Sequence, residues 1–328
     1  MTGASSAARA AAARGKGRSM KHVFIINPAA GKSDSRQRVY QMAEALRRRH
    51  GLDVECMLTK SKGHATALTR GLAAAGGEVR FYACGDDGTV NEVANGAAGF
   101  ANAAMTAVPI GTGNDFLKNF GADAALFSDP ENLWNGETQA LDLIECNGRL
   151  CLTIACSGVD ARIAQDVHRY AASPLLGGKG SYVASLIANF LFKGIASHWT
   201  LTLGDETPDE RDFALVAVCN GRYYGGGFMP VAEARMTDGV LNTLVVKKVT
   251  RAQFLRFLGS YGKGEWEKFP HLAACYTVPR VRIRSERADI VTCLDGECAV
   301  SDDVTLRLAE KKLNFFGPPG CSPDATAK

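Results

Sequence analysis

The stretch Tyr82-Ala83-Cys84-Gly85-Asp86-Asp87-Gly88-Thr89-Val90-Asn91-Glu92 predicts a buried strand, a tight turn and a helix in direct succession. The residues before Gly85 are apolar, and apolar side chains recur at helical spacing after it, at Val90, Val93, Ala94 and Ala97. Such a turn points free backbone N–H groups above the carboxyl end of the strand, where α/β sheets bind phosphate. The glycines allow an anion to approach the backbone, and Asp87 offers the carboxylate that a magnesium nucleotide needs.

Two further turns of this kind lie nearby in the chain. Asn27-Pro28-Ala29-Ala30-Gly31 follows the expected strand His22–Ile26, and Gly111-Thr112-Gly113-Asn114-Asp115 follows the expected strand Thr106–Ile110. One such turn would be an ordinary connection, but three in succession indicate a nucleotide-binding sheet. A G-x-x-x-x-G-K-[ST] loop is absent, as is a G-x-G-x-x-G fingerprint in the right context, so neither a Walker-type fold nor a Rossmann dehydrogenase is indicated.

In this order the motifs resemble the diacylglycerol kinase catalytic-domain family, which includes bacterial lipid kinases and sphingosine kinases. The segment Asn220–Pro230 followed by Asp238-Gly239 looks like the second signature of that family, and Leu294-Asp295-Gly296-Glu297 looks like its third. The resemblance extends from Met20 to about Pro318. NAD kinases are distantly similar and share the G-G-D-G turn, but the N-D-F turn and the late D-G-E point away from them.

The resemblance implies ATP and Mg²⁺ as cofactors. The residues that it assigns to ATP are Asn27, Pro28, Ala29, Ala30, Gly31, Thr59, Gly85, Asp86, Asp87, Gly88, Thr89, Asn91, Glu92, Thr112, Asn114 and Asp115. Asp87 and Asp115 would hold the catalytic Mg²⁺ directly or through water, although Asp115 could also simply cap the helix after it. A structural Mg²⁺ is implied at the Asp238 carboxylate and the backbone carbonyls of Arg235 and Val240.

The late D-G-E motif carries the implied general base. Asp295-Gly296 taken alone predicts a hairpin turn. With the other motifs, Asp295 becomes the expected base for the acceptor hydroxyl, and Glu297 a supporting or alternative base. The sequence does not decide between the two carboxylates.

One residue departs from the family pattern. The G-G-D-G-T motif is Gly85-Asp86-Asp87-Gly88-Thr89 here, so Asp86 stands where a glycine facing phosphate is expected. A carboxylate about 4 Å from a phosphate oxygen would cost about 4 kcal/mol at an effective dielectric constant near 20. If nothing offsets this cost, it weakens ATP binding roughly a thousandfold. A metal ion between Asp86 and the phosphates would reverse the penalty.

Bulk composition limits the class of protein and its partners. The chain has 328 residues, of which 46% are hydrophobic and 22% charged, as in soluble globular proteins. Four of its 38 basic residues fall in the first 20 positions, which contain no acid, and the remaining 34 balance the 34 acidic residues. A neutral body argues against nucleic acid as a partner. Residues 1–19 predict a disordered basic tail.

The cysteines and the length of the apolar runs indicate where in the cell the protein is expected to act. None of the ten cysteines forms a C-x-x-C pair, which favours reduced thiols in the cytoplasm. No apolar run approaches the about 20 residues of a membrane span, so a lipid substrate would be met at the membrane surface. The oligomeric state stays open between a monomer and a homodimer.

The domain organisation follows a change of pattern at about Phe127. Strands and helices alternate over 20–127, which predicts an α/β nucleotide-binding domain. From 128 to 310 a mainly antiparallel β-sandwich is expected. The expected strands are Gln139–Cys146, Arg149–Cys156, Trp199–Leu203, Phe213–Cys219, Val240–Val246, Thr277–Ser285, Ile290–Leu294 and Val304–Leu308, with helices at about Val159–Tyr170 and Ser181–Lys193. By resemblance, residues 311–328 return to the first domain and the cleft lies between the domains.

The expected function is ATP-dependent phosphorylation of a lipid hydroxyl, with diacylglycerol or a related lipid as the acceptor. A catalytically impaired nucleotide- or lipid-binding homologue, disabled by Asp86, is the alternative, and NAD kinase is less favoured. Because the shape of the cleft decides specificity, the sequence leaves the identity of the lipid open.

Overall fold

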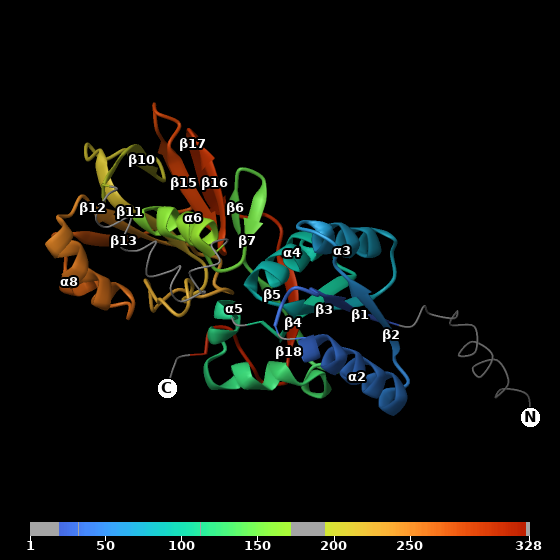
Figure 1. The fold of residues 1–328 in the computed structure, drawn as a ribbon. Coiled ribbons are helices and arrows are strands. Elements are labelled where there is room, and N and C mark those ends of the chain that lie inside the picture. Colours follow the sequence, from blue (N-terminus) through green and yellow to red (C-terminus); the bar gives the residue numbers. More distant parts are fainter. Residues whose placement is uncertain (1–19, 32, 112, 172–193, 326–328) are drawn as a thin grey trace, which may run out of the picture.

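A computed structural model describes residues 20–31, 33–111, 113–171 and 194–325. The predicted two-domain architecture is confirmed: an α/β domain is followed by an antiparallel β-sandwich, and the two lie side by side (Figure 1). Three predictions concern residues outside the described ranges: the tail 1–19, the ATP contact at Thr112 and the apolar helix at 181–193.

The first domain is built on a six-stranded sheet in the order β2-β1-β3-β4-β18-β5. Neighbouring strands are parallel except β5, which pairs antiparallel with β18. The strands are β1 (Lys21–Ile26), β2 (Asp53–Leu58), β3 (Val79–Gly85), β4 (Ala103–Pro109), β5 (Glu137–Leu141) and β18 (Leu313–Gly317). The first sheet therefore extends past residue 127, and its fifth strand comes from the final segment of the chain.

Helices cover both faces of this sheet. α3 and α4 lie on one face and α2 on the other (Figure 1). The helices of this domain are α2 (Ser33–His50), α3 (His64–Ala74), α4 (Asp87–Ala97), α5 (Asp115–Lys118) and the 3-10 turns η1 (Gly121–Ser128) and η2 (Pro130–Asn132). Across the described ranges of both domains, no helix is long and apolar enough to pass through a bilayer.

The second domain consists of two antiparallel sheets packed face to face. One sheet has the order β10-β14-β17-β6-β7; the other has β13-β12-β11-β8-β15-β16, with β9 paired to β11. The strands are β6 (Ile144–Cys146), β7 (Arg149–Cys151), β8 (Ile154–Gly158), β9 (Ser197–His198), β10 (Thr200–Leu203), β11 (Asp212–Cys219), β12 (Asn242–Lys247), β13 (Ala273–Thr277), β14 (Arg280–Arg284), β15 (Ile290–Leu294), β16 (Glu297–Ser301) and β17 (Asp303–Leu308). Helices α6 (Val159–Ala171) and α8 (Arg251–Tyr261) and the 3-10 turn η3 (Trp266–Lys268) complete it.

Three expected strands are each two strands in the structure. The strand predicted at 139–146 divides at Asp142, where the chain passes from the first sheet to the sandwich. The strand predicted at 149–156 divides because the N–H groups of Leu152 and Thr153 bind the Asp295 carboxylate instead of a neighbouring strand. Of the strand predicted at 277–285, Thr277 ends β13 and the rest begins as β14 after Pro279, which has no N–H to donate.

An aromatic cluster explains why β18 lies in the first domain. Phe315 is fully buried, with its ring centroid 5.1 Å from that of Phe116, 5.5 Å from Phe120 and 6.0 Å from Phe127. These rings come from the segment directly after the third turn. The cluster therefore fixes both the late strand and the start of α5.

Replacing Phe315 by alanine should destabilise the protein by about 3–5 kcal/mol, because the other rings cannot fill the space that it leaves. Urea unfolding followed by circular dichroism measures this difference. Val300→Ala is the control, since Val300 is 55% exposed, and its unfolding midpoint should stay near that of the unchanged protein. A loss below about 1 kcal/mol for Phe315→Ala would contradict the anchoring role, given the usual cost of emptying a core site.

Candidate active site

The three turns meet at the carboxyl edge of the first sheet, as parallel strands require. The side-chain amide of Asn27 in the first turn donates to Thr89 Oγ1 in the second, 3.1 Å away. The third turn packs so closely on the second that a β-carbon at Gly113 would lie 2.9 Å from Asp87 Oδ2, and one at Gly111 2.9 Å from the β-carbon of Asp86. Glycine is required at both positions by this approach.

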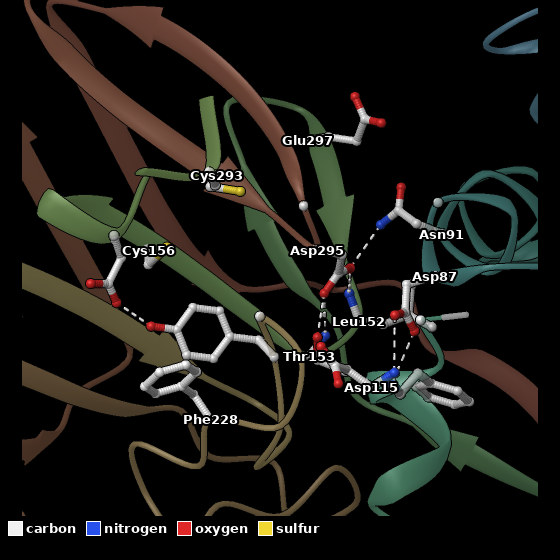
Figure 2. Close-up of a pocket in the computed structure, with 18 of the residues that line it drawn as sticks. Asp87, Asn91, Asp115, Leu152, Thr153, Cys156, Phe228, Cys293, Asp295 and Glu297 are labelled. Carbon is white, nitrogen blue, oxygen red and sulfur yellow. Dashed lines mark hydrogen bonds between the residues drawn. The ribbon is translucent and has the colours of Figure 1, made fainter. Parts of the chain in front are cut away.

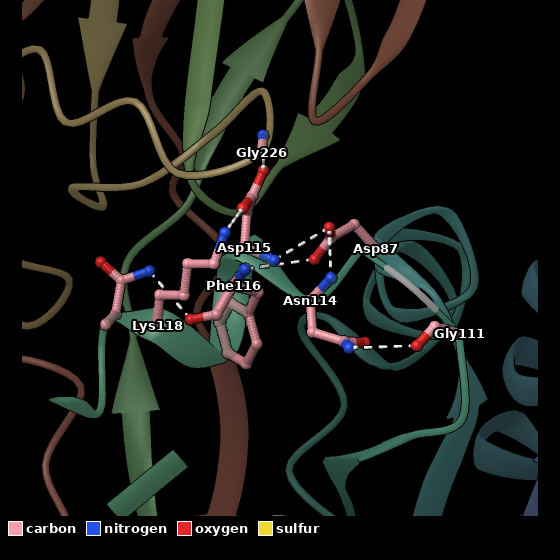
Figure 3. Close-up of polar contacts among 8 residues, drawn as sticks. Asp87, Gly111, Asn114, Asp115, Phe116, Lys118 and Gly226 are labelled. Carbon is pink, nitrogen blue, oxygen red and sulfur yellow. Dashed lines mark hydrogen bonds and ion pairs between the residues drawn. The ribbon is translucent and has the colours of Figure 1, made fainter. Parts of the chain in front are cut away.

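Asp87 holds the third turn in place. Its carboxylate accepts hydrogen bonds from three successive backbone N–H groups, of Asn114 at 2.8 Å, Asp115 at 2.9 Å and Phe116 at 3.1 Å (Figure 3). Burial raises the pKa of Asp87, and the three N–H groups act in the opposite direction. Asp87, a predicted Mg²⁺ ligand, thus also fixes the conformation of the third turn.

Asp86 caps helix α4. Its Oδ1 accepts hydrogen bonds from the Thr89 N–H at 3.2 Å and the Thr89 hydroxyl at 3.1 Å. The backbone of Asp86 is extended, with φ −101° and ψ −174°, so aspartate is not strained there. The departure from the family glycine therefore has a local structural role, and Asp86 also lines the cavity.

Asp115 joins the third turn to the second domain. One of its oxygens accepts a hydrogen bond from the Gly226 N–H at 2.6 Å, and the other pairs with the Lys118 ammonium (Figure 3). Asp115 is 8% exposed. Because Gly226 belongs to the glycine-rich segment after β11, this contact brings the second signature against the third turn.

Asp295 makes a further contact between the domains. It lies in the two-residue turn between β15 and β16 with a left-handed backbone, φ 45°, so the hairpin prediction and the site prediction coincide. Its carboxylate accepts hydrogen bonds from the N–H of Leu152 (2.6 Å), the N–H and hydroxyl of Thr153 (2.9 and 2.5 Å) and the amide of Asn91 in α4 (2.8 Å). Figure 2 shows these contacts.

Glu297 lies at the start of β16 and points away from Asp295 (Figure 2). Its carboxylate forms an ion pair with Lys62, in the loop between β2 and α3. This pair joins the two domains, and Glu297 lines the same cavity as Asp295.

These residues surround one cavity of about 430 Å³ between the domains. One end is polar and holds the carboxylates of Asp87, Asp115 and Asp295; the other end is largely apolar and includes Cys156 and Phe228 (Figure 2). The apolar lining is completed by Ile163, Ala164, Phe254, Leu258, Tyr261 and Cys293. The arrangement offers space for a molecule with one charged or polar end and one hydrocarbon end.

Other residues assigned to ATP lie at the turns in supporting positions. Glu92 caps α3, accepting hydrogen bonds from the N–H groups of Gly63 at 2.7 Å and Ala65 at 3.1 Å. The Thr59 N–H donates to the carbonyl of Ile26, and Ala30 is buried. Their assignment to ATP stays a prediction.

The implied structural metal site has contacts of its own. Asp238 Oδ1 accepts a hydrogen bond from the Val240 N–H at 3.0 Å. The adjacent Gly239 N–H donates to buried Asp142, which also pairs with Lys312 at 2.6 Å. Among the described residues no group of three His, Cys, Asp or Glu side chains is placed to hold a metal, so an ion here would depend on carbonyls and water, and the site stays a prediction.

Sequence reasoning missed the apolar half of the cavity. Phe254, Leu258 and Tyr261 come from α8, for which no helix was expected. Two signals could have found this helix: the apolar spacing of these residues, and the capping box of Thr250 and Gln253 at its start. Asp160 had no local signal, and Tyr224 lies in the second signature, Asn220–Pro230, where no role was assigned to it.

Comparison with known proteins places both domains. Residues 21–146 match the model of the diacylglycerol kinase catalytic domain, and residues 153–317 match that of the YegS C-terminal NAD kinase beta sandwich-like domain. A "Probable lipid kinase YegS-like" of Pseudomonas savastanoi is 31% identical over 216 residues, 62% of this chain and 65% of that protein. The one from Pseudomonas aeruginosa is 29% identical over 214 residues, 62% and 66% of the two chains.

A solved structure shares the fold. The crystal structure of a diacylglycerol kinase from Bacillus anthracis superposes with a TM-score of 0.65 at 20% sequence identity, covering 90% of this chain and 96% of the other. The likeness extends over both domains.

Asp86→Asn tests the charge of the helix cap separately from the cap itself. Asparagine and aspartate cap helices about equally well, so the melting temperature should not change. ATP should bind about tenfold more tightly, because the substitution removes a negative charge beside the phosphates. The gain stays below the unscreened value because solvent and salt weaken the repulsion between the carboxylate and the phosphates. Calorimetric titration of ATP at low and high Mg²⁺ measures this. Asp86→Ala is the control that also loses the cap, at a cost of about 1 kcal/mol. Weaker ATP binding by Asp86→Asn would instead show that the carboxylate supports the nucleotide.

Proposed function

This chain belongs to the family of lipid kinases that have a diacylglycerol kinase catalytic domain. We propose that it transfers the γ-phosphate of ATP to a hydroxyl of diacylglycerol or a related lipid. The observation that carries this proposal is the two-sided cavity, with phosphate turns and carboxylates at one end and an apolar pocket at the other. A nucleotide would use the first end, and the chains of a lipid would use the second.

The nucleotide end supplies position and charge, which phosphoryl transfer needs more than covalent chemistry. N–H groups at the start of α4, in the turn that Asp86 caps, would receive phosphate oxygens. Magnesium, when bound, neutralises charge on the phosphates, and Asp87 and Asp115 are the residues that would hold it. Their oxygens already accept protein hydrogen bonds or pair with Lys118. These residues fit an ion that keeps several of its waters.

Asp295 is the proposed base for the acceptor hydroxyl. An ionised carboxylate has about four acceptor positions, and four short contacts, from Leu152, Thr153 and Asn91, occupy them. The acceptor hydroxyl must therefore displace one donor. Of the two side-chain donors, Asn91 and Thr153, the Thr153 hydroxyl can leave by rotation of its O–H alone, with no movement of any heavy atom. The other contacts would hold Asp295 in place during the transfer.

A second candidate function is a nucleotide- and lipid-binding protein with impaired catalysis. Asp86 favours it, since a second carboxylate lines the cavity beside Asp87. NAD phosphorylation is less favoured, because the N-D-F and D-G-E motifs point away from NAD kinases. The reduced state proposed for the ten cysteines, all of which are free thiols, agrees with a cytoplasmic enzyme that meets its lipid at the membrane surface.

Transfer from ATP labelled in the γ-phosphate, with a mixed lipid extract and NAD as parallel acceptors, separates these functions. Label in the lipid fraction is expected. Label in NAD would overturn the proposal in favour of an NAD kinase. Label in neither, with ATP still bound, would favour the impaired homologue.

Asp295→Asn should abolish transfer and leave the ATP dissociation constant within a few-fold, because the base acts on the acceptor. Glu297→Gln is the matched control at the same turn and should retain most of kcat, since Glu297 is paired with Lys62. Single-turnover assays and ATP titrations on both variants measure these effects. Near-normal kcat for Asp295→Asn together with loss in Glu297→Gln would move the base to Glu297.

A further inference from the structure

A carboxylate and two tyrosine hydroxyls meet within the apolar part of the cavity. Asp160 comes from the first turn of α6, Tyr224 from the segment after β11 and Tyr261 from the end of α8. The Tyr261 hydroxyl lies 2.8 Å from Asp160 Oδ2 and 2.5 Å from the Tyr224 hydroxyl, which also donates to Oδ2. The proposed mechanism uses none of these three residues.

The cluster presents an acceptor to the cavity and no donor. Both tyrosine hydroxyls are directed to Oδ2, so their protons are used within the cluster. Within the part of the chain that the structure describes, no group donates to the other oxygen, Oδ1. Asp160 is only partly buried, and it lines the cavity. Oδ1 therefore has capacity for a donor supplied by a bound molecule.

The charge of Asp160 is poorly compensated. Its cationic neighbour Arg162 donates instead to the Ser197 hydroxyl and to the carbonyls of Gly194 and Ile195. No described cation forms an ion pair with Asp160, and Ile163, Phe228, Phe254 and Leu258 line the same space. A carboxylate in such surroundings is costly unless it is hydrogen-bonded. Burial accordingly raises the pKa of Asp160, while the two tyrosine hydroxyls and, more weakly, the charge of Arg162 act to lower it.

Strand β8 gives the position of the cluster relative to the site of transfer. Thr153, just before β8, binds Asp295, and Asp160 follows two residues after the strand ends. The five extended residues of β8 span roughly 16 Å at about 3.3 Å per residue. The cluster therefore faces the chain of a bound lipid rather than its head group.

We propose that Asp160, held by Tyr224 and Tyr261, selects acceptor lipids that carry a hydroxyl group within the chain region. This inference rests on the proposed function and narrows its acceptor class. An ordinary diacylglycerol has a single O–H, the one that receives phosphate, and its other polar atoms are acceptors. Such a lipid leaves Oδ1 without a donor, whereas a hydroxylated chain supplies one. A site built to hydrogen-bond a substrate hydroxyl discriminates against the analogue that lacks it.

Two lipids of otherwise equal chain length test this: dioleoylglycerol, with plain chains, and diricinoleoylglycerol, with a mid-chain hydroxyl. The unchanged protein should bind and phosphorylate the hydroxylated lipid at least tenfold better, measured as kcat/KM and, without ATP, as the ratio of bound lipids in native mass spectrometry. Asp160→Leu should remove this preference, because the variant should bind and phosphorylate dioleoylglycerol better than the unchanged protein does. Asp205→Leu is the control, since Asp205 is fully exposed, and it should keep the preference.

The readouts separate the two proposals. Equal binding of both lipids by the unchanged protein, or a preference that survives in Asp160→Leu, would overturn the selecting role and leave the cluster with a structural one. Binding preference without transfer to either lipid would overturn the kinase function and support the selecting role. Should Asp160→Leu unfold, Asp160→Asn takes its place, because it keeps the shape and removes the charge. Its preference should fall several-fold, and an unchanged preference would count against the inference.

Discussion

Backbone N–H groups at the ends of helices and in tight turns need partners, and here four aspartates supply them. Asp86 satisfies the start of α4, Asp87 the start of α5, Asp115 the glycine-rich segment of the second domain, and Asp295 the connection between β7 and β8. A buried N–H without an acceptor costs as much as a lost hydrogen bond. The carboxylates of the candidate site are therefore also the contacts on which the geometry of the cavity depends.

Because these carboxylates both line the cavity and bind backbone N–H groups, their arrangement bears on the proposed catalysis. Carboxylates fixed by several backbone donors cannot rotate freely, so the polar end of the cavity is organised before a substrate arrives, which is the condition for electrostatic stabilisation of a transition state. It also means that neutralising one of them alters both charge and loop position. Asp86 is the useful exception, because asparagine keeps its capping contact while removing the charge.

The sequence predicted most of the polar end and little of the apolar end. Each turn is local: strand, glycine and helix follow one another within about a dozen residues, as in 82–92. Asp295 was also found, because its motif is short. The residues of the apolar lining were not predicted, because Phe254, Leu258 and Tyr261 line the cavity only when α8 packs against segments far away in the chain. Asp160 is likewise one acid among 34 until Tyr224 and Tyr261 surround it.

By itself, the sequence determined that three glycine-containing turns would share one sheet edge, since the carboxyl ends of parallel strands coincide, and that a β-rich second domain would follow. Only the tertiary structure decided what these turns face. Asn91 and Asp295 are 204 residues apart in the chain and 2.8 Å apart in space, and β18 enters the first sheet between β4 and β5. Such pairings are decided by packing and by the need to satisfy buried polar groups, and neither leaves a periodic pattern in the sequence.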